Sequence, residues 1–205
     1  HLYRPLAFTE YGGKAKTPVF PLPKDIQQVK QAARPSLAWS HFVMDDDAFR
    51  PLQWGIVHSE VRYIQNLLQT LQKTGIERVI GNLYLPLLQI ANTFAFGRLT
   101  ANPNENPEHI LTDFARLVVQ KEDVSDLAQL LIWVENHSYW QQQQPLDARV
   151  PDIPNDLNHT KATAIAQHLR PKPNPDLPLP IAPVDWLTDL RRTLERMKTF
   201  PNVSL

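Results

Sequence analysis

Hydrophobic and polar positions follow two different patterns along this chain of 205 residues. In the first 85 residues, short apolar runs alternate with segments of helical periodicity. The pattern predicts strands at Leu2–Phe8, Ser36–Met44 and Glu77–Leu85, and helices at Lys24–Arg34 and Ser59–Lys73. The second helix has one apolar stripe, formed by Val61, Ile64, Leu68 and Leu71.

From Pro86 onward the pattern is helical, and no further strand is expected. Asn106, Pro107 and Glu108 form a typical helix start, with a capping side chain, a proline at the first position and an acid in the first turn. Helices are expected at Leu87–Leu99, from Asn106, from near Asp123 to before Pro145, at Asn158–Leu169 and at Val184–Thr199. Their expected buried residues are Ile110, Leu111, Phe114, Leu117, Val118, Val124, Leu127, Ala128, Leu131, Val134, Leu187, Leu190, Leu194 and Met197.

The order strand, helix, strand, helix, strand indicates parallel strands joined by helical crossovers. A parallel sheet needs cover on both faces, and three strands alone leave exposed edges. The expected fold is therefore α/β plus all-α. Residues 1–86 would be the end of a larger α/β unit that begins upstream, and residues 87–205 a helical domain.

Nineteen prolines stand against six glycines, and they are unevenly placed. The stretch "RPKPNPDLPLPIAP", residues 170–183, predicts a connector, because proline runs favour extended backbone with few hydrogen bonds. A ligand for a proline-recognising domain is the alternative. The connector would tie the last helix to the rest of the chain.

Composition excludes several classes of function. The chain has 21 basic and 21 acidic residues and no basic stripe, which argues against a nucleic-acid partner. No apolar run reaches the length of a membrane span, so a soluble protein is expected. Because there is no cysteine, thiolate metal sites are excluded, and no phosphate loop, nucleophile elbow or zinc-binding pair is found. We therefore expect no cofactor and no metal, and nothing indicates a compartment.

Glu10 is the first candidate for chemistry. It ends the first predicted strand and is followed by Gly12 and Gly13, which allow a tight loop and the close approach of a ligand. In parallel α/β folds, reactive side chains lie at the carboxyl ends of strands. The alternative is an ordinary polar residue where a strand stops.

Polar residues also follow the other two predicted strands. Asp45, Asp46 and Asp47 come after the second strand and could bind sugar hydroxyls or a cation, or could form a solvated loop. Asn82 lies at the end of the third strand and could bind a polar substrate or its own turn. Three histidines in the helical part, His137, His159 and His168, are expected at the surface.

Two stretches resemble one enzyme family. "FTEYGGKAKTPVFPLPKDI" is similar to the α-glucuronidase segment of glycoside hydrolase family 67 that carries a Glu-Tyr-x-Gly element. "GIERVIGNLYLPLLQIANTFAFGRLTANPNENPEHILTDFARLV" resembles the family's junction between barrel and C-terminal helices. Its most specific parts are "ANTFAFGRL" and "NPNENPEHI". The similarity covers roughly the first 120 residues.

The resemblance implies the last strands of a (β/α)8 barrel followed by a helical domain. It also implies an enzyme that removes glucuronic acid side groups from xylan-derived oligosaccharides with inversion of configuration. Glu10 matches the carboxylate that activates water, and the general acid would precede His1. Tyr11, Asp45, Asp46 and Asn82 would line the substrate site.

The implied partners are a carbohydrate substrate and an upstream segment or partner chain that supplies the general acid, without which the chain is inactive. A homodimer could form through the helical domain, with Trp133, Tyr139 and Trp140 as candidate surface residues, although core packing is the favoured role of Trp133. The chain departs from the family at Thr9 and at Tyr84-Leu85-Pro86, so a related glycosidase with another substrate is one alternative. The other is a non-catalytic helical interaction module with a short α/β cap.

Overall fold

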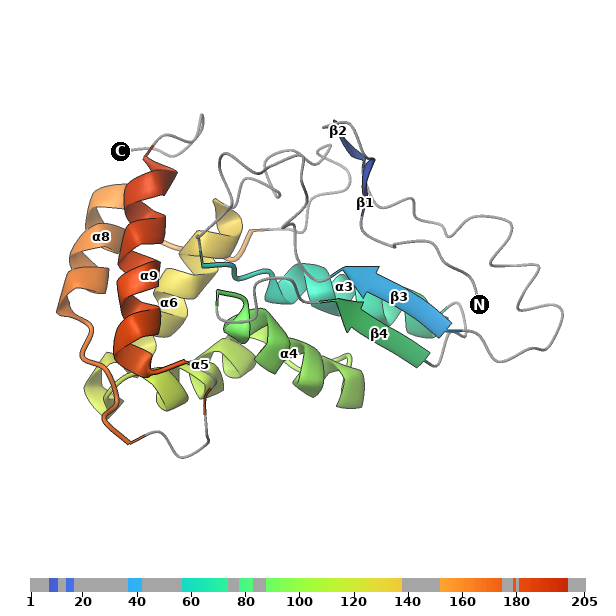
Figure 1. The fold of residues 1–205 in the computed structure, drawn as a ribbon, viewed down its shortest axis with the longest axis horizontal. Coiled ribbons are helices and arrows are strands. Elements are labelled where there is room, and N and C mark those ends of the chain that lie inside the picture. The colour runs from blue at the N-terminus through green and yellow to red at the C-terminus, as the bar shows by residue number, and fades with distance from the viewer. Residues whose placement is uncertain are drawn as a thin grey trace, which may run out of the picture.

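The structure is a computed structural model that describes residues 8–10, 14–16, 37–41, 57–73, 78–82, 88–137, 152–174, 179 and 181–198. The helices are α3 (Val61–Lys73), α4 (Ile90–Ala101), α5 (Pro107–Val118), α6 (Val124–Asn136), α8 (His159–His168) and α9 (Pro183–Met197), with a short 3-10 helix η2 (Lys121–Asp123). Figure 1 shows α8 and α9 side by side, with α4 and α5 forming the lower edge of the body in this view.

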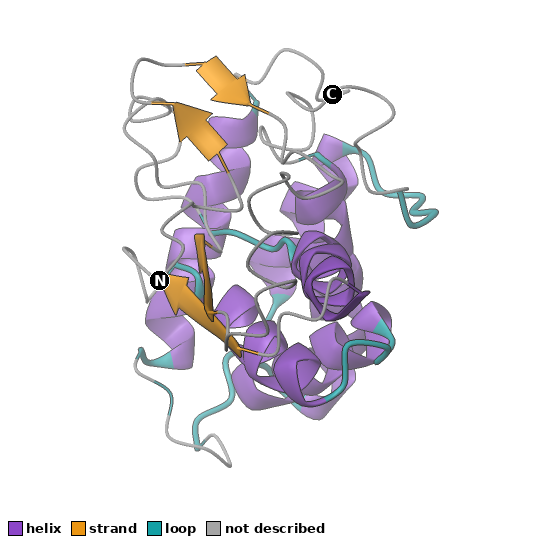
Figure 2. Ribbon diagram, turned by 90° about the vertical axis from the view of Figure 1, so that its right-hand side faces the viewer, coloured by secondary structure: helices purple, strands orange, loops and turns teal. Residues whose placement is uncertain are grey.

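The predicted fold class is wrong, because the described residues form a helical body and not the last strands of a barrel plus a helical domain. The strands among them are short: β1 (Phe8–Glu10), β2 (Lys14–Lys16), β3 (Leu37–His41) and β4 (Arg78–Asn82). They make two separate two-stranded sheets, β1–β2 antiparallel and β3–β4 parallel (Figure 2).

The physical reason lies in where the apolar side chains go. The strand predicted at Leu2–Phe8 overlaps β1 only at Phe8, and β1 pairs with the neighbouring β2 and not with β3 or β4. The core is instead formed mainly by helices. One hydrophobic cluster includes Val57 and Val61, which precede the expected domain boundary at residue 86, and Met197 at the end of α9. Of the described strand residues, Val79 packs against that core.

The helices predicted after residue 86 are confirmed within a few residues, with one exception. The helix predicted from near Asp123 to before Pro145 ends at Asn136. Asn106 caps α5, since its Oδ1 accepts a hydrogen bond of 2.7 Å from the backbone N–H of Glu108. Asn158 caps α8 in the same way, with 2.9 Å to the N–H of Lys161. The residues predicted to face inward on α5, α6 and α9 are all buried.

Aromatic rings join three of the helices. The Phe114 ring on α5 lies 5.8 Å from that of Phe94 on α4 and 5.3 Å from that of Trp186 on α9, in an edge-to-face arrangement with Trp186. Phe114 and Trp186 are each 1% exposed. The cluster therefore fixes α9 against helices whose rings, Phe114 and Phe94, lie 72 and 92 positions before Trp186 in the chain.

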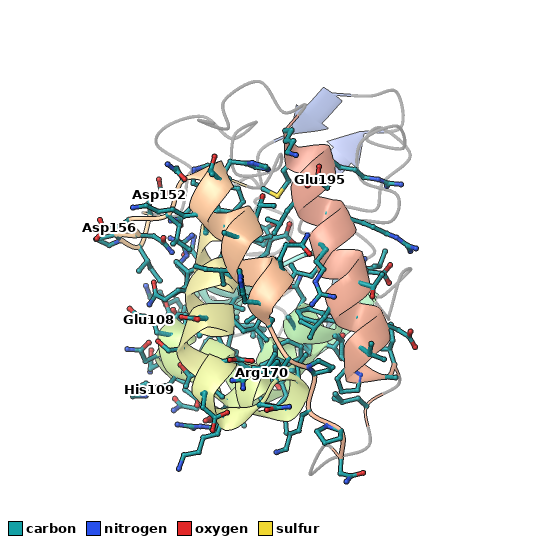
Figure 3. The ribbon with its side chains drawn as sticks, turned by 90° about the vertical axis from the view of Figure 1, so that its left-hand side faces the viewer. Glu108, His109, Asp152, Asp156, Arg170 and Glu195 are labelled. Carbon is teal, nitrogen blue, oxygen red and sulfur yellow. The ribbon has the colours of Figure 1, made fainter. Side chains whose placement is uncertain are left out.

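The predicted connector begins by binding back to the body. Pro171 forms an isolated bridge with Val119, and the guanidinium of Arg170 pairs with Asp123, at 2.7 Å between Nη2 and Oδ1 (Figure 3). These contacts hold the segment after α8 against the corner between α5 and α6.

One surface prediction for the histidines is wrong. His159 is buried, and its Nε2 lies 2.8 Å from the carbonyl oxygen of Leu194. His137 stacks on Trp133 at 4.5 Å between ring centroids, while His168 is exposed as predicted. A histidine at the start of α8 is buried because α9 packs against α8.

Candidate functional site

Polar side chains are buried together where α3 begins. His58, Ser59 and Glu60 precede the helix, as expected for an N-terminal helix position, and all three are buried. The Glu60 backbone N–H donates to Asn92 Oδ1 at 2.8 Å, and Asn92 Nδ2 donates to Glu60 Oε2 at 3.1 Å. This reciprocal pair ties the start of α3 to α4.

A carboxylate from a third helix completes this buried centre. Glu135 Oε1 on α6 accepts from the backbone N–H of Arg62 at 2.8 Å, and its Oε2 lies 3.2 Å from Arg62 Nε. Arg62 Nη2 also donates to Asn136 Oδ1 at 2.6 Å. Because a helix leaves its first N–H groups unpaired, Glu135 both caps α3 and neutralises its arginine.

The electrostatics of the centre reflect its burial. Removal from water raises the pKa of Glu135 to about 7, and this effect outweighs the opposing attraction of Arg62. Burial also raises the pKa of Tyr63, and the charge of Glu60 adds to it. The contacts of Glu60 and Glu135 join the start of α3 to α4 and α6.

We expect the raised pKa of Glu135 to make stability fall with rising pH. The folded state holds the Glu135 proton more tightly than the unfolded chain, so this stabilising term is complete below about pH 4.5 and is lost as pH rises through about 7. The free energy of unfolding should fall by roughly 1–3 kcal/mol over that window. Urea unfolding followed by circular dichroism would measure it.

Glu135→Gln is the matched control for this pH effect, because it keeps an oxygen acceptor but cannot titrate. The difference between the stability–pH profiles of the parent protein and the variant gives the contribution of Glu135 alone. Acids such as Asp113 and Asp123 have lowered pKa values, so their contribution makes stability rise with pH in both proteins. Parallel profiles for the two proteins would contradict the expectation.

A cleft of about 680 Å³ lies directly beside this buried centre. It runs between α3 and the loop that joins α4 to α5. Its lining residues are Arg62, Gln65, Asn66, Gln69, Asn104, Glu105, Asn106, Pro107, Glu108 and Ile153. Arg62 belongs to both features, since it lines the cleft and is held by Glu135 and Asn136.

Side-chain amides of α3 hold the loop that forms the far wall. Gln65 Nε2 donates to the carbonyl oxygens of Pro103, at 3.1 Å, and Glu105, at 2.6 Å. Gln69 Nε2 donates to the same Pro103 oxygen at 3.0 Å. The loop is thus fixed to one face of α3.

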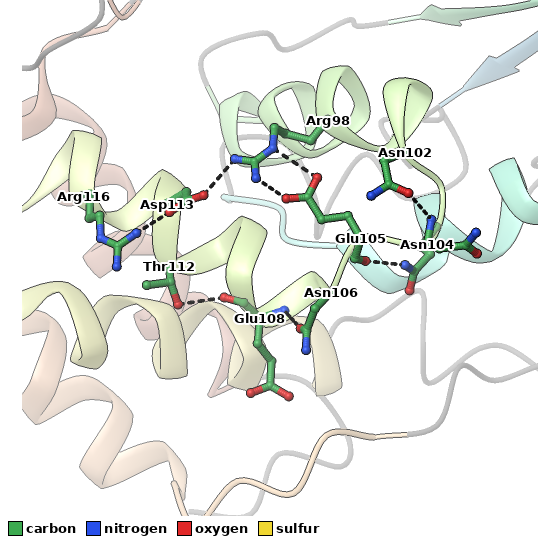
Figure 4. A network of polar contacts seen from close by, with 10 residues as sticks. Arg98, Asn102, Asn104, Glu105, Asn106, Glu108, Thr112, Asp113 and Arg116 are labelled. Carbon is green, nitrogen blue, oxygen red and sulfur yellow. Dashed lines mark hydrogen bonds and ion pairs between the residues drawn. The ribbon is translucent and has the colours of Figure 1, made fainter.

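An ion-pair network holds the same loop from behind. Arg98 on α4 binds the carboxylate of Glu105 through Nε, at 3.1 Å, and Nη2, and it binds Asp113 on α5 through Nη1 at 2.8 Å (Figure 4). Hydrogen bonding to Arg98 lowers the pKa of Asp113 and raises that of the guanidinium. The loop that forms this wall of the cleft is therefore held by contacts with both α3 and α4.

Two of the predicted catalytic and substrate-binding residues, Glu10 and Asn82, belong to the described part of the chain, and neither lines the cleft. Glu10 ends β1 and Asn82 ends β4, in separate sheets, and Asn82 lies opposite His41 in the β3–β4 register. Tyr11, Asp45 and Asp46 lie outside the described residues. The structure thus does not bring Glu10 and Asn82 to one sheet edge, and their roles stay predictions.

Sequence reasoning missed the cleft. The signal for it was the polar face of α3, Gln65, Asn66 and Gln69, together with the asparagine-rich loop at 102–106. Within the described ranges, no three histidine, aspartate or glutamate residues are grouped to hold a metal ion. No helix in that part of the chain combines the length and apolar character that a membrane span requires.

No family model, curated protein or solved structure matches this chain.

Proposed function

We propose that the helical body is a non-catalytic part of a glycoside hydrolase, one that removes glucuronic acid side groups from xylo-oligosaccharides or acts on a related carbohydrate. The observation that carries the proposal concerns the segment with the most specific resemblance, Ala91–Ile110. It forms α4, the cleft loop and the start of α5, and its polar residues Asn92, Arg98 and Asn106 all make structural contacts.

The contacts of three acids, two of them buried and one in a surface ion pair, support a non-catalytic body. Glu135 is held by Arg62, Glu60 by Asn92, and Asp113 by Arg98. A general acid or base must reach the substrate within hydrogen-bonding distance. Acids that are committed to buried or ion-pair contacts are poor candidates for that task.

The proposed chemistry therefore takes place outside the body. Glu10 activates water, and a general acid on an upstream segment or a partner chain protonates the leaving oxygen, as inversion requires. On this proposal the chain does not hydrolyse glycosides by itself.

A helical interaction module without a hydrolase partner is the second candidate, and the predominantly helical fold favours it. Trp133 is not part of its dimer surface, in agreement with the expected core role. That residue is fully buried in the core, while Tyr139 and Trp140 lie outside the described residues.

Glu10→Gln in the native protein that contains this chain tests the proposal. We expect hydrolysis of glucuronic-acid-substituted xylo-oligosaccharides to fall by about 10²-fold or more, because an amide cannot take the proton from water. Released sugar and its anomeric configuration would be followed by proton NMR.

Asn82→Ala is the comparison variant, and circular dichroism checks that both variants stay folded. Asn82 is a predicted binding residue, so its loss should raise KM more than it lowers kcat. Unchanged turnover in Glu10→Gln would overturn the assignment of Glu10, and the absence of glycoside hydrolysis in the native protein would favour the helical interaction module.

A further inference from the structure

We propose that the cleft between α3 and the α4–α5 loop binds an uncharged, hydroxyl-rich ligand, specifically a short neutral oligosaccharide. The choice of a sugar among hydroxyl-rich ligands rests on the proposed function. The site is separate from Glu10, so it would hold a neutral stretch of carbohydrate and not the bond to be cleaved.

The cleft has the size and order of a binding site. Its volume of about 680 Å³ lies within the range of roughly 300–1,000 Å³ that is typical of small-molecule pockets. Its two walls are joined by Gln65 and Gln69 and supported by Arg98. Because these contacts already hold the loop, ligand binding does not carry the conformational-entropy cost of ordering it.

The charge balance of the lining favours a neutral ligand. The charge of Arg62 is met by Glu135, and that of Glu105 by Arg98. Glu108 also lines the cleft, and among the described residues its carboxylate forms no ion pair with a basic side chain. Its side chain extends away from the Arg98 network (Figure 4) and lies on the same side of the molecule as Asp152 (Figure 3). An anionic ligand such as a uronate would be repelled.

The lining groups offer complementary hydrogen bonds for hydroxyls. Gln65 and Gln69 use Nε2 to hold the loop, which leaves each Oε1 as an acceptor. Asn106 uses Oδ1 to cap α5, which leaves Nδ2 as a donor. A sugar hydroxyl both donates and accepts, so it can bind the Glu108 carboxylate and an amide at once.

NMR titration of the chain with xylotetraose, a neutral xylan fragment, tests the proposal. We expect the side-chain amide signals of Gln65, Gln69 and Asn106 to shift together with the backbone signals of the loop. Equal concentrations of free glucuronate should leave them unchanged.

Two variants separate binding from folding. Glu108→Gln removes an exposed charge and should weaken xylotetraose binding about tenfold or more, because hydrogen bonds to charged groups contribute most. Asn106→Ser keeps a good helix cap but removes the Nδ2 donor, and should also weaken binding. Asp185→Asn, which changes an exposed first-turn acid on α9, is the matched control and should not.

Shifts with glucuronate but not with xylotetraose would overturn the proposal, and so would equal affinities of Glu108→Gln and the parent protein. The outcomes also separate this proposal from the hydrolase assignment. Absence of sugar binding alongside Glu10-dependent hydrolysis rejects only the cleft. Sugar binding in a native protein that hydrolyses no glycoside rejects only the proposed reaction.

Discussion

Replacing Glu135 with alanine should lower the free energy of unfolding by about 3–5 kcal/mol at pH 8, which is the usual cost of removing one partner from a buried ion pair. The substitution leaves the buried guanidinium of Arg62 without its carboxylate and the first turn of α3 without its cap. Both groups are shielded from water, so solvent cannot replace the lost contacts. Urea unfolding would give the difference directly.

Glu135→Gln should cost much less, about 1.5 kcal/mol or below, because the amide oxygen still accepts from the Arg62 N–H. The pair of variants separates the capping contact from the charge. Equal losses in the two variants would show that the charge, and not the capping contact, dominates. A loss below 1 kcal/mol in Glu135→Ala would contradict the buried pair itself.

Phe114→Ala should lower the free energy of unfolding by about 3–5 kcal/mol, the usual range for a fully buried aromatic side chain. Phe114 touches Phe94 on one side and Trp186 on the other, so its loss opens a cavity between α4, α5 and α9. Chemical unfolding measured by the fluorescence of the buried tryptophans would report the change.

Phe114→Leu fills most of the same space and should cost clearly less than the alanine variant. Val184→Ala, on the exposed side of α9, should change stability by less than about 0.5 kcal/mol. A small effect of Phe114→Ala would mean that α9 does not depend on the aromatic cluster for its position.

The helices could be predicted from the sequence because their signals are local. The start of α5 is predicted by Asn106, Pro107 and Glu108. The spacing of apolar residues in α5, α6 and α9 predicts which faces of these helices are buried. Such patterns depend on residues within a few turns of one another. The structure changes most of their boundaries by only a few positions, and the largest change is the end of α6 at Asn136.

The parallel pairing of β3 with β4 agrees with the sequence, but the pairing of the first strand could not be predicted, because strand pairing is decided by residues outside the strand itself. The apolar run ending at Glu10 carries no information about its neighbour, and it pairs with Lys14–Lys16 instead of the next apolar run. The order of elements suggested a larger parallel sheet because α3 lies between two segments that form strands. Its stripe, including Val61 and Ile64, belongs to the same buried core as the later helices.

The polar centre and the cleft were hidden for the same reason. Asn92 and Glu135 each lie inside an otherwise apolar helix. The neighbouring sequence does not indicate which residue each of them contacts. Glu60 and Arg62 are 32 and 73 positions away from them. A polar residue at an otherwise apolar position predicts that a partner exists, but only the tertiary structure identifies it.

One hydrogen bond has a consequence for the order in which the protein folds during synthesis. The backbone N–H of Val57 donates to Thr193 Oγ1 across 136 positions, and α9 also supplies Trp186 to the core. Domains fold as their residues leave the ribosome, from the N-terminus onward. The body can therefore begin to assemble early, but the core around Phe114 stays open until α9 has emerged, and a nascent chain paused before Pro183 exposes that apolar surface to chaperones.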